Sequence, residues 1–318
     1  MTLRVAVFGA GAIGAYYGAR LADGGADVAF IARGRHLDAL KSDGLTLVTP
    51  EATSSHRILA TADPADIGPV DVVLFCVKSY DTDDGAARLA PLLHDDTGVI
   101  SLQNGIDNED RIAGVIGASH VLGGAAYIIA SIREPGVVEA AGPRHIVLGE
   151  LDGSGRSTRI EAILEVAERA GLGVEAVDDV RIAKWEKYTL LVAFSAMTAT
   201  VRLPIGDIRR APAAVEMLRA IMTEVRAVGV AKGISLGDDL VARQMTLLLS
   251  QADGSTTSLY HDLVTGHRME VEALQGAAVR LGRARGVATP FLDAAYAILE
   301  PWAIRNNRPV DDRLAIPG

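Results

Sequence analysis

Three glycines near the start of the chain have the spacing of a phosphate-binding turn. Gly9, Gly11 and Gly14 follow the apolar run Val5 to Phe8 and open an amphipathic stretch. The first glycine permits a tight turn, the second lets the backbone approach a pyrophosphate, and the third lets the helix pack close to the sheet. Helix N–H groups would then face the phosphates. The pattern predicts a dinucleotide site formed by Gly9, Ala10, Gly11, Ala12, Ile13 and Gly14.

The end of the second predicted strand carries arginine where many dinucleotide sites carry an acid. NAD-specific sites place Asp or Glu about 20 residues beyond the glycines, to bond the ribose 2′-hydroxyl. Here residues 32–36 read Ala-Arg-Gly-Arg-His, and the first carboxylate is Asp38. Because a guanidinium fork suits a 2′-phosphate, we expect Arg33 to select NADP(H). A solvated basic loop is the alternative.

Two further polar side chains follow strands that we expect in the middle of the sheet. Val72 to Val77 is an apolar run typical of a central parallel strand, and Lys78 follows it. The run Val99 to Leu102 is followed by Gln-Asn-Gly, which includes Asn104. Open α/β sheets bind ligands at the carboxyl ends of their strands. A surface lysine and a simple Asn-Gly turn would explain the same residues.

A nicotinamide cofactor could reduce a ketone here only with a proton donor for the oxygen. The first half offers no obvious acid, so we expect the donor in the helical half. Lys184 and Lys187 lie three apart on one face of a predicted buried helix, and periodicity does not choose between them. Glu270 shares an apolar helix face with Leu274, while Glu272 faces water. A buried acid is costly unless paired, so Glu270 could partner the lysine or form a structural ion pair.

The elements that position these residues begin as a βαβ unit, with a helix to Asp23 and a strand at Val28–Ala32. Turn signals and alternation predict further strands, several of them in an antiparallel extension of the sheet. These strands are Leu45–Val48, Arg57–Leu59, Val121–Ile132, Gly136–Ala140, His145–Leu148 and Val174–Val177. Helices are predicted at Thr82–Leu93, Ser157–Ala170, Lys184–Val201, Ala213–Val230, Leu236–Ser250, Met269–Arg285 and Pro290–Ile304, with a loose tail from Arg305.

The predicted fold class is therefore α/β. A Rossmann-type dinucleotide-binding domain with an antiparallel extension would span residues 1–178, and an all-helical substrate and catalytic domain would span residues 179–318. Lys184 to Val201 is apolar nearly all round after its first turn, as expected of a helix buried in its domain.

Composition excludes several classes of protein. The 318 residues are 49% hydrophobic and 22% charged, with a net charge of −9, so no nucleic-acid or membrane affinity is expected. Cys76 is the only cysteine, which leaves no disulfide or cysteine-based metal site, and we expect no metal. No apolar run reaches the roughly 18 to 20 residues of a membrane span, and no signal peptide is evident. A cytoplasmic protein fits these features.

The chain resembles the ketopantoate reductase (2-dehydropantoate 2-reductase) family over most of its length. The matching pieces are GAGAIG at 9–14, Arg33, VKSYD at 77–81, QNG at 103–105, PGVV at 135–138, GE at 149–150, KWEK at 184–187 and SLYHDLVTGHRMEVE at 258–272. The family reduces 2-dehydropantoate to pantoate with NADPH, in the pantothenate route to coenzyme A. The resemblance implies a Rossmann domain followed by a helical domain.

The resemblance also implies a role for each matching cofactor position. The turn Gly9 to Gly14 would bind the pyrophosphate, and Arg33 the 2′-phosphate. Lys78 would lie near the adenosine phosphate end, and Ala130 would line the site. Asn104 would lie between cofactor and substrate.

The implied chemistry belongs to the helical half. Lys187, two residues after Trp185, would donate the proton, with Glu270 as its partner. Ser258 would contact the substrate carboxylate. The family has asparagines four and eight residues after the catalytic lysine, where this chain has Leu191 and Ser195, and only Ser195 keeps a hydroxyl for substrate.

These departures, together with Met269 in place of a family threonine, weaken the preference for a hydroxylated substrate. We expect an NADPH-dependent 2-oxo-acid reductase, with ketopantoate as the substrate we expect before any other 2-oxo acid. A paralogue for a more apolar 2-oxo acid is the alternative enzyme. A non-catalytic NADPH-binding protein is the alternative outside enzymes, and the presence of both Lys187 and Glu270 argues against it. The helical domain could supply a homodimer face.

Overall fold

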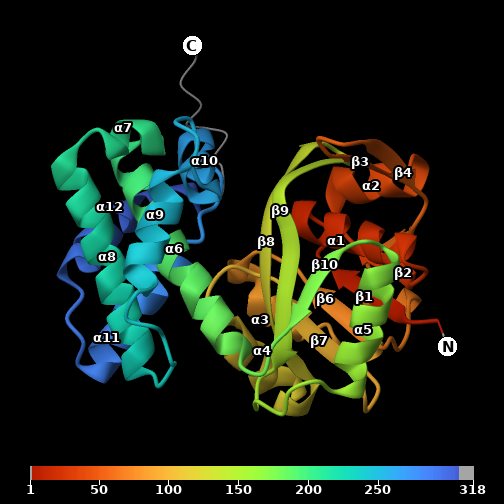
Figure 1. The fold of residues 1–318 in the computed structure, drawn as a ribbon. Coiled ribbons are helices and arrows are strands. Elements are labelled where there is room, and N and C mark those ends of the chain that lie inside the picture. Colours follow the sequence, from red (N-terminus) through yellow and green to blue (C-terminus); the bar gives the residue numbers. More distant parts are fainter. Residues whose placement is uncertain (1, 308–318) are drawn as a thin grey trace. The chain divides into compact units, whose positions relative to one another are not determined.

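The computed structural model describes residues 2–307. The chain forms two compact units, one up to Lys184 and one from Trp185 onward. The first is an α/β unit built on one sheet and the second is helical, which confirms the predicted fold class (Figure 1). Helix α6 (Val180–Val201) contains the point of division.

The sheet of the first unit has ten strands, in the order β4-β3-β9-β8-β7-β6-β1-β2-β5 with β10 paired to β9. Their bounds are β1 Arg4–Phe8, β2 Asp27–Ile31, β3 Leu45–Val48, β4 Thr53–His56, β5 Leu59–Thr61, β6 Val72–Phe75, β7 Gly98–Ser101, β8 Val121–Glu134, β9 Val137–Glu150 and β10 Gly173–Ala176.

Six neighbouring strands form the parallel part of the sheet. Every adjacent pair in the sheet order β5-β2-β1-β6-β7-β8 is parallel. In chain order this run is third, second, first, fourth, fifth, sixth, which is the order of a dinucleotide-binding sheet. The chain crosses from one side of β1 to the other before β6. The carboxyl ends of β1 and β6 therefore flank the point where such sheets bind ligands.

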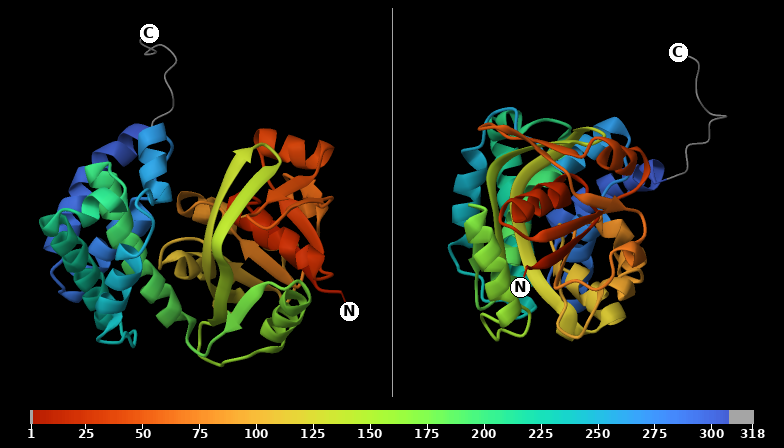
Figure 2. Two further views of the ribbon diagram at one scale, coloured as in Figure 1. Left: turned by 45° about the horizontal axis from the view of Figure 1, so that its top comes forward. Right: turned by 90° about the vertical axis from the view of Figure 1, so that its right-hand side faces the viewer.

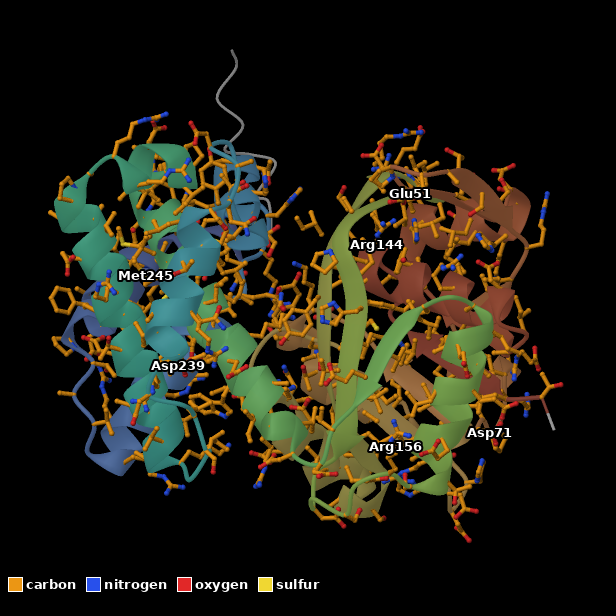
Figure 3. The ribbon with its side chains drawn as sticks, viewed as in Figure 1. Glu51, Asp71, Arg144, Arg156, Asp239 and Met245 are labelled. Atoms are coloured by element: carbon orange, nitrogen blue, oxygen red, sulfur yellow. The ribbon has the colours of Figure 1, made fainter. Side chains whose placement is uncertain are left out.

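The antiparallel extension contains a long hairpin, in which β8 pairs with β9, and β9 also pairs in parallel with β3 and β10. Strands β8 and β9 are long and curved in Figure 2. The sequence predicts a break at residues 142–143, but the chain stays in the sheet and the pairing shifts register between Tyr127 and Ile129 instead. Arg144 has a positive φ of 53°. Its guanidinium binds Glu51 at 2.5 and 2.6 Å (Figure 3), and this holds the pKa of Glu51 down at about 2.

Helices cover both faces of the sheet because alternate strand residues point to opposite sides. Val5 and Val7 of β1 join a core with α1 (Ala12–Asp23) and α5 (Thr158–Arg169). Ala6 and Phe8 join the opposite core, with α3 (Thr82–Ala86) and α4 (Asn108–Ile116). The remaining helix of this unit is α2 (Gly34–Ser42). Short 3-10 turns are η1 Pro64–Asp66, η2 Ser79–Asp81, η3 Ala90–Leu92 and η4 Ala118–His120.

The helical unit is built around α6, whose residues 192–199 are all buried. The elements after it are α7 Ile205–Arg209, α8 Pro212–Ala231, α9 Leu240–Leu249, α10 Ser258–Thr265, the π-helical turn η5 Glu272–Gly276, α11 Ala277–Arg285 and α12 Pro290–Asn306. Two hydrogen bonds join α6 to the η5 segment: the Tyr188 hydroxyl of α6 donates to the Leu274 carbonyl, and Gln275 Nε2 donates to the Ser195 hydroxyl of α6. Among the described residues, no helix has the length and apolarity needed to cross a membrane.

Several elements differ from the sequence prediction. Helices α2, α4, α7 and α10 are additional, and β4 and β5 replace the single strand expected at Arg57–Leu59. These helices have nine residues or fewer, which is shorter than the window of about 11 to 18 residues in which helical periodicity is recognised. Arg305 and Asn306 complete α12, and the rest of the predicted loose tail, from residue 308, lies outside the described residues.

Candidate active site

The glycine turn after β1 combines two packing requirements with one open position. Gly9 has a φ of +92°, and a Cβ there would lie 2.8 Å from the Val77 backbone nitrogen. A Cβ on Gly14 would lie 2.6 Å from the Gly9 carbonyl oxygen. Gly11 differs, because its φ is −73° and a Cβ there would meet no described atom within 4 Å. The open space at Gly11 fits a ligand that approaches the backbone.

The amino end of α1 adds donors to this space. Gly11 is the N-cap residue, no side-chain hydrogen bond caps the helix, and its first turn holds no acid. The first N–H groups of a helix have no partner inside it, so they can bind an anion. Ala10 is buried, while Ala12 and Ile13 are half-buried. The predicted turn therefore has the shape and polarity of a pyrophosphate site.

Arg33 stands directly after β2 as the N-cap residue of α2. Its side chain is 86% exposed, and Nη2 donates to Asp81 Oδ2 at 2.6 Å. Asp81 lies in the 3-10 turn η2 that follows β6. The contact brings the two predicted motifs, Arg33 and VKSYD, side by side at the same edge of the sheet.

His36 belongs to the same region, and sequence reasoning did not select it. Its Nδ1 accepts a hydrogen bond from the Gly136 backbone N–H at 3.1 Å. Burial lowers the pKa of His36, and the nearby Ala10 carbonyl opposes that shift. The imidazole thus binds the turn between β8 and β9. A lone histidine in a polar run carries no sequence signal for this role.

Lys78 and Asn104 follow the next two strands at this edge. β1 pairs with β6 through Phe8 and Phe75, and β6 pairs with β7 through Phe75 and Ser101. The three carboxyl ends are therefore adjacent, and they bring Gly9, Lys78 and Asn104 to one side of the sheet. Lys78 is exposed and Asn104 is half-buried. Ala130 lies further along, in the half of β8 beyond the first register shift.

Lys184 has a structural partner that the sequence did not indicate. Its Nζ donates to Glu109 Oε1, and each side chain is only 6% exposed. Glu109 lies in the first turn of α4, where a carboxylate also complements the helix dipole. Because Lys184 is itself almost fully buried in this pair, it has little surface from which to deliver a proton to a ligand. This favours Lys187, which is half-buried, as the candidate donor.

The segments that carry Lys187 and Glu270 pack against each other within the helical unit. The Tyr188 hydroxyl donates to the Leu274 carbonyl, and Gln275 Nε2 donates to the Val192 carbonyl at 3.2 Å. Glu270 is 6% exposed whereas the Glu272 side chain is 61% exposed, as the sequence predicts. Direct pairing of Lys187 with Glu270 stays a prediction, which requires that their two segments pack against each other, as these bonds show they do.

The predicted substrate residues differ in accessibility. Ser258 is exposed and is the first residue of α10, which Thr257 caps by accepting from the Tyr260 N–H at 3.3 Å. Ser195 is fully buried, and its hydroxyl donates to the Val192 carbonyl at 3.2 Å while it accepts from Gln275 Nε2 at 2.8 Å. Its role as a substrate contact stays a prediction.

Comparison with known proteins places this geometry in a family. Residues 5–153 match the model of "Ketopantoate reductase PanE/ApbA", and residues 179–302 match that of "Ketopantoate reductase PanE/ApbA C terminal". The 2-dehydropantoate 2-reductase of Archaeoglobus fulgidus is 35% identical over 285 residues, which cover 89% of this chain and 92% of that protein.

Solved structures agree with the sequence matches. A PanE/ApbA family ketopantoate reductase from Ralstonia eutropha superposes with a TM-score of 0.89 at 32% identity, over 96% of this chain and all of that chain. A D-mandelate dehydrogenase with NADH and anilino(oxo)acetate has a TM-score of 0.87, over 96% of this chain and all of that one. Its 22% identity shows a shared fold alone.

The sheet order, the glycine turn and the following helical unit define a dinucleotide-binding oxidoreductase. Within that class, the chain belongs to the ketopantoate reductase family, as the sequence resemblance implies.

Proposed function

We propose that the chain reduces a 2-oxo acid to the 2-hydroxy acid with NADPH, and that 2-dehydropantoate is its preferred substrate. Support comes from the family and from relatives named 2-dehydropantoate 2-reductase, of which that of Halobacterium salinarum is 32% identical. The observation that carries the proposal is the open space at Gly11, beside an α1 amino terminus without a side-chain cap.

The residues present fit NADPH as the cofactor. The turn from Gly9 to Gly14 would hold its pyrophosphate on backbone N–H groups. Arg33 gives one of its five guanidinium N–H donors to Asp81, and others would bind the 2′-phosphate. Lys78, Asn104 and Ala130 would complete the site. When bound, NADPH supplies a hydride to C2 of the substrate.

Lys187 would donate the proton that the substrate oxygen takes up in this reaction. Positioned proton transfer contributes about 10²- to 10⁴-fold to such a step. Glu270 would keep the ammonium charged and oriented, because a buried carboxylate favours the protonated lysine. Asn104 and Ser258 would bind the acid, with the amino end of α10 favouring the carboxylate. Ser195 would reach substrate only by giving up its bond from Gln275.

One observation favours a more apolar 2-oxo acid as an alternative substrate. Leu191 lies four residues after Lys187 on α6, so the two side chains share a helix face. Leu191 is half-buried, and Met269 beside Glu270 is 3% exposed. An apolar group next to the donor would accept an alkyl substituent better than a hydroxyl.

A panel of 2-oxo acids, assayed by NADPH and NADH oxidation, tests the proposal. We expect the highest kcat/KM with 2-dehydropantoate and NADPH. A preference for branched or linear alkyl 2-oxo acids would support the alternative substrate. Binding of NADPH without turnover on any member would instead indicate a non-catalytic binding protein. The homodimer and the cytoplasmic location stay predictions, and light scattering measures the first.

A further inference from the structure

A buried polar network joins the ends of β6 and β7. Gln103, two residues after β7, is 6% exposed. Its Nε2 donates to the Val77 carbonyl at 2.9 Å and to Thr82 Oγ1 at 2.8 Å. Its Oε1 accepts from the Ser101 hydroxyl at 3.1 Å. The Gln103 side-chain amide thus connects the segment after β6 with the end of β7.

The amide has a single favourable orientation. Both Nε2 hydrogens are used, one on a carbonyl oxygen and one on a hydroxyl. A flipped amide would turn Oε1 toward the Val77 carbonyl, which has no hydrogen to donate, and toward the Thr82 hydroxyl, whose hydrogen is used on Ser79. Thr82 is fully buried as well, and its hydroxyl lies 2.8 Å from the Ser79 carbonyl that it donates to. A buried polar group without partners costs about 1–3 kcal/mol, so this network holds the amide in place.

The residues that Gln103 connects are neighbours of two candidate cofactor residues. Val77 directly precedes Lys78, and Gln103 directly precedes Asn104. The same network reaches Asn104 from its other side, because Asn108 Nδ2 donates to the Asn104 carbonyl at 2.9 Å. Core packing alone gives no reason for an amide here, since an apolar side chain of the same size would need no partners.

We propose that Gln103 is a positioning residue of the cofactor site, which clamps the segment after β6 to the segment after β7 and so fixes Asn104 relative to Lys78. The inference rests on the proposed function of Asn104 as a residue between cofactor and substrate. Gln103 acts through Asn104 and touches neither ligand. Loss of the clamp leaves the Rossmann core formed and lets the Asn104 segment shift.

The test compares two variants at opposite ends of β7. Q103M keeps the length of the side chain and removes its hydrogen bonds. T97V is the control, because Thr97 is fully buried just before β7 and donates to the Val70 carbonyl at 2.7 Å. We expect the Kd for NADPH or the KM for the 2-oxo acid to rise about tenfold in Q103M and to stay unchanged in T97V. Equal effects of the two variants on both constants would overturn the proposal.

A double-mutant cycle with N104A separates this inference from the proposed function. If Gln103 acts through Asn104, Q103M has little further effect on either constant in the N104A background. Additive effects would overturn the clamp while leaving the role of Asn104 intact. If N104A alone changes neither cofactor binding nor turnover, the proposed function of Asn104 fails, and the clamp with it.

A milder variant covers the case in which Q103M does not fold. S101A removes only the hydroxyl that holds Gln103 Oε1 and leaves both Nε2 bonds intact. We expect it to shift the same constant in the same direction by a smaller factor. An S101A protein with wild-type constants at an unchanged Tm would contradict the proposal.

Discussion

The two units hold their candidate residues by different means. In the unit up to Lys184, the glycine turn, Arg33, Lys78 and Asn104 each follow a parallel strand, and the sheet brings them to one edge. In the unit from Trp185, Lys187 and Ser195 lie on a helix that is buried on most sides. A strand end places its next residue by topology alone. A position on a buried helix gains its role from whichever distant segment packs against it.

Lys184 and Lys187 lie on the same helix but belong to the two different units. They share a helix face, yet Lys184 is fixed by Glu109 of α4, whereas Lys187 is half-buried and its neighbour Tyr188 bonds the η5 segment. Three residues of sequence separate an ion pair from a candidate proton donor.

The largest expected effect is on turnover in K187A. We expect kcat to fall about 10²- to 10⁴-fold while the Kd for NADPH stays within about twofold, because the role proposed for the lysine is proton donation and not cofactor binding. Steady-state kinetics and NADPH fluorescence titration measure the two. Turnover near the wild-type rate would remove Lys187 from the mechanism.

The matched variant on the same helix, K184M, should lose stability instead. It leaves Glu109 buried without its partner, and breaking such a pair costs about 3–5 kcal/mol. Urea unfolding monitored by circular dichroism gives the change in free energy. The double variant K184M/E109L should recover much of the lost stability. A K184M protein that is stable but inactive would reverse the assignment of the two lysines.

Arg33 should determine cofactor choice. R33A removes a charge-assisted contact worth about 1.5–3 kcal/mol, so NADPH binding should weaken about 10- to 100-fold with little change for NADH. R35A is the control, since Arg35 is also exposed but lies inside α2. Equal losses of affinity for NADPH and NADH in R33A would exclude a 2′-phosphate contact.

Gly11 and Gly14 should separate ligand binding from packing. In G11A the new methyl group meets no described atom, so we expect the free energy of unfolding to change by less than about 0.5 kcal/mol. NADPH affinity should fall on the order of tenfold, because the methyl group would occupy the ligand's space. G14A should lose stability, since its Cβ would meet the Gly9 carbonyl at 2.6 Å. Unchanged NADPH binding by G11A would place the pyrophosphate elsewhere.

The smallest effect concerns pH. Burial lowers the pKa of His36 in the folded protein, so below about pH 6.5 the unfolded chain binds more protons than the folded one. Stability therefore falls as the pH drops from about 6.5 toward the folded pKa. The stabilising contribution of His36 is complete only above about pH 6.5. H36Q should flatten this part of the stability profile, measured by urea unfolding at a series of pH values. The same slope in H36Q and wild type would assign the pH dependence to other groups.

The sequence predicted the fold class and the glycine turn because both depend on local patterns. An apolar run followed by Gly9, Gly11 and Gly14 needs no distant partner to be recognised. The burial of Glu270 and the exposure of Glu272 also followed from spacing, although Glu270 lies before the helical residues and Glu272 begins the π-helical turn η5.

What the sequence did not reveal depends on contacts between distant residues. Glu109 lies 75 positions before Lys184, and His36 lies 100 positions before Gly136. Neither pair leaves a spacing signal. The role of Gln103 was hidden for the same reason, since its partners Val77 and Thr82 precede it by more than 20 residues.

The most direct test of the central claim follows the hydride itself. The wild-type protein is incubated with 2-dehydropantoate and NADPH that carries deuterium at C4 of the nicotinamide, and the product is examined by mass spectrometry and NMR. We expect a 2-hydroxy acid with deuterium at C2, formed in step with NADPH oxidation. NADPH that binds but transfers no label to this or any other 2-oxo acid would contradict it.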